Sequence, residues 1–287
     1  MRNTSTSSKT NTNNLSPDIF IHFPSMHFYK YQGTGNDFVM IDDRSEVFDT
    51  TAVERIKWLC DRRFGIGADG LILLRRHHTA DFQMVYFNSD GNPSTMCGNG
   101  GRCIAHFARH LGVIGNSGCF LAADGFHNVH LTEDTVALQM KDVNGIEEND
   151  GFLFIDTGSP HVVVVEEALD TMDLCSRARE IRYNERFRAA GTNVNFIRNV
   201  NGTIHIRTYE RGVEDETLSC GTGMTAAAIA ASHLYNLDEA TCLAGIPLKA
   251  PGGNTSVRFR KTTQNGYSEV FLTGPAVMVF EGDITLP

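Results

Sequence analysis

The sequence predicts an α/β (α+β) protein made of two similar halves, each with a helix enclosed by sheet. Three observations support this prediction. The chain has 287 residues, which is more than one domain usually needs and too few for three. The order strand, turn, Cys-Gly-x-Gly segment and helix occurs twice. The second of these helices is apolar nearly all round and therefore needs sheet on every side.

Strands and helices alternate through the first half of the chain. Hydrophobic spacing predicts strands over 28–31 and 38–42, followed by a helix over 51–62. A further strand over 82–87 runs into a turn, 88–91, with the sequence Asn-Ser-Asp-Gly. This alternation indicates the α/β class.

The first cysteine-glycine segment, 97–101, reads Cys-Gly-Asn-Gly-Gly and precedes a helix. Cys103 and Phe107 belong to a stripe of apolar residues at helical spacing, and Gly112 closes the predicted helix. The pattern places Cys97 at or just before a helix N-terminus.

The second half repeats this order of elements. A strand over 204–209 and a turn over 212–215 precede the segment 219–223, which reads Ser-Cys-Gly-Thr-Gly. A helix over 224–234 follows, so Cys220 also stands at a helix start. The halves share little identity elsewhere, which indicates a structural duplication and not a solenoid of short repeats.

The composition excludes several classes of partner. Hydrophobic residues make up 41% and charged residues 21%, and no apolar run approaches the length of a membrane span. The formal charge of −9, with no basic block, repels nucleic acid and favours a small-molecule partner. Seven cysteines without CxxC pairs, and no signal-peptide pattern, indicate a reducing cytoplasm. Residues 1–25 predict a flexible tail, although a misassigned start codon upstream of Met26 is the simpler explanation.

Two cysteines at two helix starts predict acid/base chemistry. The unpaired amides and partial positive charge of a helix N-terminus favour a thiolate, so we expect lowered pKa values for Cys97 and Cys220. The neighbouring glycines let backbone amides approach a carboxylate closely. A thiolate on one face of an α-carbon and a thiol on the opposite face can invert that carbon. The structural alternative for a free cysteine is a small buried hydrophobic residue, which suits the other cysteines.

Six motifs occur in one order between Met26 and the C-terminus. They are GTGNDF (33–38), FNSDG (87–91), MCGNGGRC (96–103), GTNVNF (191–196), YERGVEDET (209–217) and SCGTG (219–223). Together they resemble the diaminopimelate epimerase family. The resemblance implies a pyridoxal-independent conversion of LL- to meso-diaminopimelate, without cofactor or metal, on the way to lysine and peptidoglycan.

The same resemblance implies an architecture. It implies two pseudo-symmetric domains, 26–139 and 140–270, each a mostly antiparallel sheet or barrel wrapped around a central helix. The last strand, 271–287, would return to the first domain, and the site would lie between the domains. By family analogy the protein is cytoplasmic, binds neither nucleic acid nor membrane, and forms a homodimer.

Carried over by position, the resemblance makes Cys97 and Cys220 the acid and base, with His161 and Glu210 tuning their pKa values. The substrate-binding residues that it implies are Asn36, Asn88, Gly98, Asn99, Asn193, Glu210, Arg211, Gly221 and Thr222. Neutral amides, one acid and one Arg suit a substrate with two ammonium and two carboxylate groups. Ser159 departs from the family, which often has Asn there, so a hydrogen bond to the distal end of the substrate is shortened, lost or carried by water.

Two alternative functions stay open. Another two-cysteine racemase, acting on proline, hydroxyproline or histidine, would share the fold. Proline-type enzymes usually carry Cys-Gly-His, whereas this chain has Asn99 after Gly98. This difference does not exclude a histidine racemase. A non-catalytic binding module would have no need for both thiols together with Glu210 and Arg211.

Other signals are weak. The glycine-rich stretch 65–70 lacks the Lys-Ser/Thr of a phosphate-binding loop, so we predict a turn before a strand over 71–74. His106 and His110 share a helix face but have no evident third metal ligand, so packing or surface roles are expected.

Overall fold

The computed structural model describes residues 25–286, and its first element begins at Ser25. The predicted tail, 1–25, therefore lies outside the described residues except for its last residue. No helix within the described part of the chain is both long and apolar enough to cross a membrane.

The first half is a mixed sheet of β1 to β7. β1 and β2 form an antiparallel hairpin, β2 and β3 are parallel, β3 and β4 are antiparallel, and β4 and β5 are parallel. β5, β6 and β7 form an antiparallel meander. The bounds are β1 Ser25–Gly33, β2 Asn36–Asp42, α1 Val53–Cys60, β3 Gly70–Arg75, β4 Phe82–Asn88, α2 Gly98–His110, β5 Ser117–Ala122, β6 Gly125–Leu131 and β7 Val136–Gln139.

The second half repeats this order of pairings in β9 to β16. β9 and β10 are antiparallel, β10 and β11 parallel, β11 and β12 antiparallel, and β12 and β14 parallel, before the antiparallel meander of β14, β15 and β16. The bounds are β8 Glu147–Asn149, β9 Phe152–Asp156, β10 Pro160–Val165, α3 Leu174–Arg182, β11 Asn193–Val200, β12 Thr203–Glu210, β13 Asp215–Thr217, α4 Gly221–Leu234, α5 Glu239–Ala244, β14 Ile246–Ala250, β15 Gly253–Lys261 and β16 Tyr267–Gly274. The predicted duplication is therefore confirmed, strand by strand.

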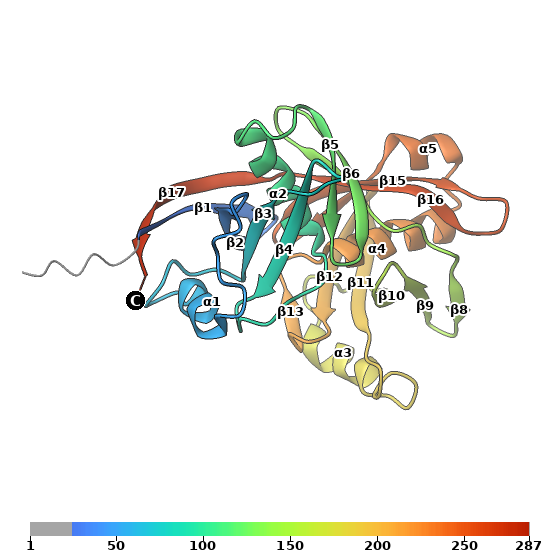
Figure 1. Cartoon of the computed structure of the whole chain (residues 1–287). Helices are drawn as coiled ribbons and strands as arrows, with labels where there is room; N and C mark the ends of the chain where they lie inside the picture. The colour runs from blue at the N-terminus through green and yellow to red at the C-terminus, as the bar shows by residue number, and fades with distance from the viewer. Residues whose placement is uncertain (1–24, 287) are drawn as a thin grey trace, which may run out of the picture.

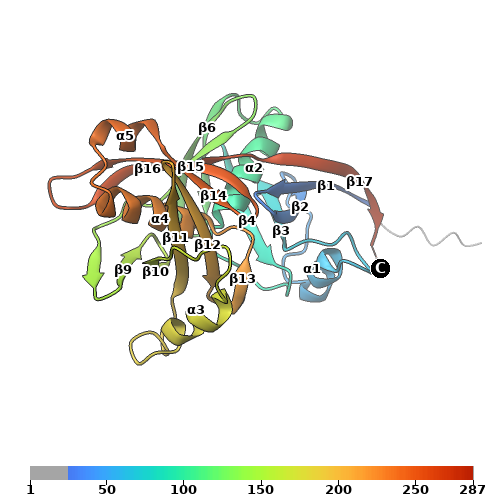
Figure 2. The same ribbon diagram turned by 180° about the vertical axis from the view of Figure 1, so that it is seen from behind.

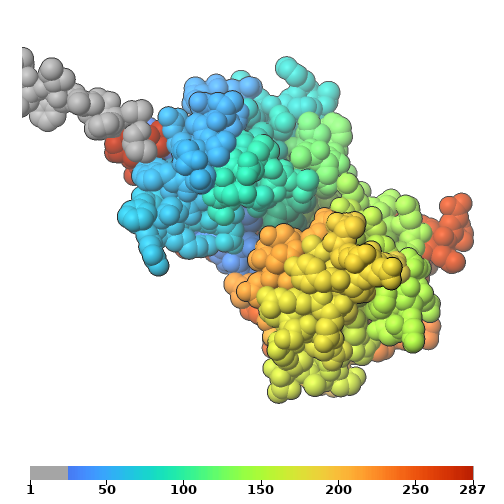
Figure 3. Space-filling view, turned by 90° about the horizontal axis from the view of Figure 1, so that it is seen from below, coloured from blue at the N-terminus to red at the C-terminus, as the bar shows by residue number. Residues whose placement is uncertain are grey.

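Two pairings join the halves. β7 pairs antiparallel with β16, and the last strand, β17 (Val277–Thr285), pairs antiparallel with β1. Figures 1 and 2 show β17 running along the outer edge of the first half beside β1. Figure 3 shows the halves as neighbouring lobes, the first in blue to teal and the second in yellow-green to orange. The division into domains 26–139 and 140–270 stays a prediction.

Each half encloses one helix. α2 contacts strands of the first half, and α4 contacts strands of the second half from β9 to β16. In α4, the six residues from Ala226 to Ala231 are all 0% exposed, which is why this helix can be apolar on every face. Burying one large side chain such as Ile229 stabilises the fold by about 1.5–3 kcal/mol.

Helix α1 is shorter than the sequence predicts. The predicted helix spans 51–62, whereas α1 ends at Cys60. Asp61 takes an extended conformation, and its carboxylate accepts the backbone N–H groups of Arg63 and Phe64. A side chain that binds the backbone in this way competes with helix continuation.

Candidate active site

The two cysteines stand at equivalent positions. Cys97 is the residue immediately before α2, and Cys220 is the residue immediately before α4. Both have extended backbones, with φ −112° and ψ 125° for the first and φ −120° and ψ 115° for the second. The prediction that each cysteine lies at a helix N-terminus is therefore confirmed.

The two helix starts meet at their glycines. A Cβ atom built on Gly98 would lie 3.2 Å from the Cα of Gly221, and one built on Gly221 would lie 3.0 Å from the Cα of Gly98. Such a close approach of two backbones requires residues without side chains. The glycines therefore bring the amide-rich ends of both helices, and with them both cysteines, to one place.

Asn99 ties the first helix start to the loop before the second. Its Nδ2 donates to Oδ1 of Asn36 at 2.5 Å and to the carbonyl of Ser219 at 3.3 Å. Thr34 adds a hydrogen bond to the Ser219 hydroxyl at 3.1 Å. Two of the sequence-predicted binding residues, Asn36 and Asn99, thus lie together beside the Cys220 loop.

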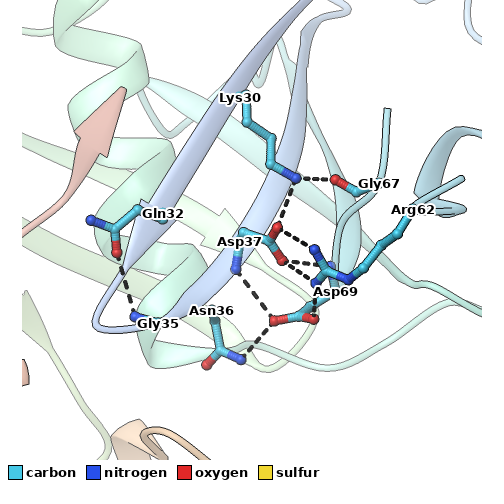
Figure 4. Close-up of polar contacts among 8 residues, drawn as sticks. All are labelled: Lys30, Gln32, Gly35, Asn36, Asp37, Arg62, Gly67 and Asp69. Carbon is cyan, nitrogen blue, oxygen red and sulfur yellow. Dashed lines mark hydrogen bonds and ion pairs between the residues drawn. The ribbon is translucent and has the colours of Figure 1, made fainter. Parts of the chain in front are cut away.

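The Asn36 amide is hydrogen-bonded to the Asp69 carboxylate, as Figure 4 shows. Its Nδ2 donates to Oδ2 of Asp69 at 3.0 Å, and Arg62 bridges Oδ1 of Asp69 at 2.8 Å and both oxygens of Asp37 at 2.7 and 2.8 Å. Lys30 pairs with Asp37 at 2.8 Å. Burial raises the pKa of Asp37, but the hydrogen bonds from Arg62 and Lys30 outweigh it and lower that pKa to about 2.

Asp69 is a site residue that no sequence pattern indicated. The stretch 65–70 leads into β3 as predicted, yet its aspartate fixes the amide of a predicted binding residue. Asn88, another predicted binding residue, pairs in register with Gly70, and the next residue, Ser89, donates its N–H to the Asp69 carbonyl at 3.1 Å. Asn88 therefore belongs to the same side of the site.

A second cluster comes from the other half. Oδ1 of Asn193 accepts the backbone N–H of Arg211 at 2.8 Å, which fixes the orientation of this amide. Its Nδ2 then donates to the Ser159 hydroxyl at 3.2 Å and to the Pro160 carbonyl at 3.1 Å. The position where the family often has Asn is thus bonded to a predicted binding residue.

His161 is fully buried and neutral. Burial, followed by the positive charge of Arg211, lowers its pKa to about 3. Nδ2 of Asn195 donates to its Nδ1 at 3.1 Å and to the Val162 carbonyl at 3.0 Å. Because a carbonyl can only accept, the Asn195 amide has a fixed orientation, so Nδ1 of His161 is an acceptor and Nε2 carries the hydrogen.

The thiols differ from the sequence-based expectation. Burial, followed by the charge of Glu210, raises the pKa of Cys220 to about 12, against the opposing bonds from Thr222 and Gly223. Burial also raises the pKa of Cys97 despite two backbone amides that favour its thiolate. The expectation of lowered pKa values is therefore wrong, because desolvation outweighs the effect of the helix N-termini.

Glu210 and Cys220 are both shielded from water. Burial raises the pKa of Glu210, and the charge of Asp69 raises it further. Cys220 is only 8% exposed, and Thr157 donates to the Thr222 carbonyl beside it at 3.1 Å. Access of a substrate to Cys220 therefore requires the segments around this thiol to move apart. Among residues 25–286 there is no group of three His, Cys, Asp or Glu side chains placed to hold a metal.

Residues 28–151 and 153–279 match the family model described as diaminopimelate epimerase. The chain belongs to the diaminopimelate epimerase family. Three relatives carry the name diaminopimelate epimerase. The protein from Flavobacterium psychrophilum is 49% identical over 90% of this chain and 100% of its own length. Those from Chlorobaculum tepidum and Aquifex aeolicus are 41% and 40% identical, over 88% and 91% of this chain and 99% and 98% of their own lengths.

Solved structures share the fold of this family member at low identity. A Bacillus anthracis phenazine biosynthesis protein of the PhzF family has a TM-score of 0.73 and 14% identity, covering 91% of this chain and 99% of its own. A hydroxyproline epimerase from Agrobacterium vitis has a TM-score of 0.63 and 15% identity, covering 91% and 93%. The predicted diaminopimelate epimerase-like fold is confirmed by these likenesses.

Proposed function

We propose that this diaminopimelate epimerase family member inverts one α-carbon of LL-diaminopimelate to give the meso isomer, with Cys97 and Cys220 as its acid/base pair. The observation that carries the proposal is the meeting of two Cys-Gly helix starts, one from each half, through Gly98 and Gly221. The relatives named diaminopimelate epimerase, which align over about nine-tenths of the chain, support the substrate.

The proposed reaction needs one proton acceptor and one proton donor on opposite faces of the carbon. A thiolate of one cysteine takes the α-proton, and the electron pair of the broken C–H bond moves into the carboxylate as an enediolate. The thiol of the other cysteine then delivers its proton to the opposite face, forming the new C–H bond and leaving a thiolate. The reverse reaction exchanges the two roles, so one pair of thiols serves both directions.

The helix starts would stabilise the developing charge. Amides of Gly98, Asn99, Gly221 and Thr222 lie in the first turns of α2 and α4, where N–H groups have no partner within the helix. A carboxylate between them gains hydrogen bonds and the favourable ends of two helix dipoles. These bonds strengthen as negative charge accumulates on the enediolate, which lowers the barrier to proton removal.

Substrate binding would also ionise a thiol. In the free protein burial and Glu210 keep the pKa values of both cysteines raised. The α-ammonium of the substrate brings a positive charge between the thiols, and an opposite charge within a few ångströms favours the thiolate. Glu210 is the acid that would bind this ammonium. Activation would therefore depend on the substrate, which protects the free protein's thiols from side reactions.

The distal end of the substrate would lie between the two amide clusters. We assign Asn36 and Asn88 from the first half, and Asn193 and Arg211 from the second, to its ammonium and carboxylate groups. Arg211 supplies a guanidinium fork suited to a carboxylate. Ser159 is bonded to Asn193 at 3.2 Å and so would act through that amide.

His161 would tune the site as a neutral hydrogen-bond donor. Its Nδ1 accepts from Asn195 at 3.1 Å, which leaves the Nε2–H to donate. A neutral donor supports nearby negative charge without adding a proton that could be lost near pH 7.

The decisive test is a racemisation screen in deuterated water with diaminopimelate, proline, hydroxyproline and histidine, followed by NMR. We expect deuterium incorporation and inversion with diaminopimelate only. Turnover of histidine or a proline instead would replace the substrate assignment while leaving the reaction type. The double variant Cys97→Ala/Cys220→Ala should lose at least about 10²–10⁴-fold in α-hydrogen exchange. Exchange at the wild-type rate in that variant would refute the two-thiol reaction. Light scattering of the purified protein would test the proposed homodimer.

A further inference from the structure

Arg102 is a fully buried cation without a carboxylate partner. It is 0% exposed and ranks first by volume among the fully buried side chains. Its hydrogen bonds reach only neutral oxygens, those of Thr34, Asn99, Gly98 and Pro275, at 3.0, 3.0, 3.3 and 3.3 Å. Within residues 25–286, the ionisable groups that act on it are thiols and not acids.

A buried charge with neutral partners is costly, so a compensating anion is expected nearby. Guanidinium remains protonated in proteins, and Arg102 cannot escape the cost by losing its proton. Two thiols act on it, those of Cys97 and Cys103. Cys103 lies on the buried face of α2, and burial raises its pKa to about 12. Burial also raises the pKa of Cys97, but this thiol is partly exposed and stands at the start of α2, so its thiolate is the more accessible counter-charge.

The equivalent position in the other half is neutral. Arg102 lies five residues after Cys97, and its Nη1 donates to the Gly98 carbonyl at 3.3 Å. Thr225 lies five residues after Cys220, and its hydroxyl donates to the Gly221 carbonyl at 3.1 Å. The two helix starts therefore have similar backbone conformations, and in each the side chain five residues after the cysteine donates to the carbonyl of the first glycine. Only in the first helix does that side chain carry a positive charge.

The other ionisable groups do not create the same difference. Glu210 acts on both cysteines and raises the pKa of each. The charge of Cys97 raises the pKa of Tyr86. The same charge raises the pKa of Cys220. Arg102 favours the charged form of Cys97, as the smallest of the influences on this thiol, whereas no cation in the described part of the chain is among the groups that act on Cys220.

We propose that Arg102 is a positioning residue whose charge makes Cys97, and not Cys220, the thiolate at the start of turnover. The inference rests on the proposed two-cysteine reaction and assigns its roles. The isomer whose α-hydrogen faces Cys97 is then the one whose deprotonation is favoured when the substrate binds. Arg102 has a second effect, since its bond to Oδ1 of Asn99 directs the amide nitrogen of that residue toward Asn36 and Ser219.

The test is the pH profile of alkylation of each thiol by iodoacetamide, quantified for the two cysteine-containing peptides by mass spectrometry on the full chain. We compare the pH midpoints of the two alkylation profiles, because the maximal alkylation rate of each thiol also depends on how easily iodoacetamide reaches it. In the wild-type protein we expect the midpoint for Cys97 to lie at least about one pH unit below that for Cys220, a tenfold difference in thiolate population. Arg102→Gln should raise the Cys97 midpoint by about one unit and leave that of Cys220 nearly unchanged.

Two further variants distinguish the effect of the Arg102 charge from the effect of losing a hydrogen bond at a helix start. Arg102→Lys keeps the charge and should keep the Cys97 midpoint low. Thr225→Val removes the matched contact in the other half without changing charge, and should leave both midpoints unchanged. Equal midpoints in the wild type, or an equal shift of both in Arg102→Gln, would overturn the proposal.

A second measurement covers the case in which Arg102→Gln does not fold. Thiolate absorbance near 240 nm is titrated in the wild type, in Cys220→Ser and in Cys97→Ser; the difference between each variant and the wild type isolates one thiol, because the other five cysteines are common to all three. Cys97 should ionise at lower pH than Cys220, and the reverse order would refute the proposal. Failure of the wild-type protein to epimerise diaminopimelate would contradict the proposed function without altering this order.

Discussion

The two halves of the molecule share a backbone plan but hold their polar side chains differently. In both, a parallel strand pair flanked by antiparallel partners precedes a cysteine at a helix start. The first half fixes its amides with charges, through Asp69, Arg62 and Arg102. The second half fixes its amide with a neutral group, since the backbone N–H of Arg211 orients Asn193, and the Asn195 amide orients His161. The duplicated backbone thus supplies two similar helix starts, and the side chains around them give each a different electrostatic setting.

The comparison predicts that the shared backbone contact is the most sensitive feature. Gly98→Ala and Gly221→Ala each place a Cβ within 3.2 Å or less of a backbone atom of the opposite helix start. Overpacking of this kind costs about 1–3 kcal/mol of stability. A shift of about 1 Å between the cysteines should lower kcat/KM by roughly 100-fold. Thermal unfolding and steady-state kinetics measure the two effects.

Gly115→Ala is the matched control for this prediction, because a Cβ there meets no atom within 4 Å. It should leave activity and stability unchanged. Wild-type kcat/KM in Gly98→Ala or Gly221→Ala would show that the two helix starts need not touch for turnover.

The backbone plan could be predicted from sequence because its signals are local. Glycines beside Cys97 and Cys220, followed by apolar residues at helical spacing, place both thiols at helix starts. The contacts of Asp69 with Asn36 and of Asn195 with His161 join residues 33 and 34 positions apart, and no local pattern specifies them. A glycine-rich stretch containing one acid was the available signal for Asp69.

The prediction of lowered pKa values for Cys97 and Cys220 was wrong for a related reason. The helix N-termini were visible in the sequence, but the burial of Cys220, which is 8% exposed, arises only in the folded protein. Arg102 was visible only as part of a motif, because its neutral surroundings come from Thr34 and Pro275, far away in the chain. Energies that depend on three-dimensional burial are therefore the part that a linear pattern cannot supply.

The burial of His161 in the second half predicts a dependence of stability on pH. The pKa of His161 is about 3 in the folded protein, against an ordinary value of 6.5. Below pH 6.5 the unfolded chain takes up a proton that the folded protein does not, so the free energy of unfolding falls as the pH drops from 6.5 toward 3. This group adds a slope of at most about 1.4 kcal/mol per pH unit. Urea unfolding between pH 4 and 7 measures it.

His161→Gln should reduce the slope of the unfolding free energy against pH by the contribution of one titrating group, at most about 1.4 kcal/mol per pH unit. His78→Gln, which removes an exposed histidine, is the control and should keep the wild-type slope. An unchanged slope in His161→Gln would mean that this histidine is not held neutral by burial.

The charged setting of the first half predicts a smaller effect on substrate binding. Asp69→Asn weakens the bonds that orient Asn36 and the Asp37 backbone N–H, at 3.0 and 3.3 Å. The loss of about 1 kcal/mol expected for one hydrogen bond corresponds to a rise in KM of roughly three- to tenfold, with little change in kcat. Asp49→Asn, an acid bonded only within its own turn to Thr51, is the control and should leave KM unchanged. If kcat falls while KM is constant, Asn36 acts in the proton-transfer step and the charged cluster of the first half serves catalysis more than substrate binding.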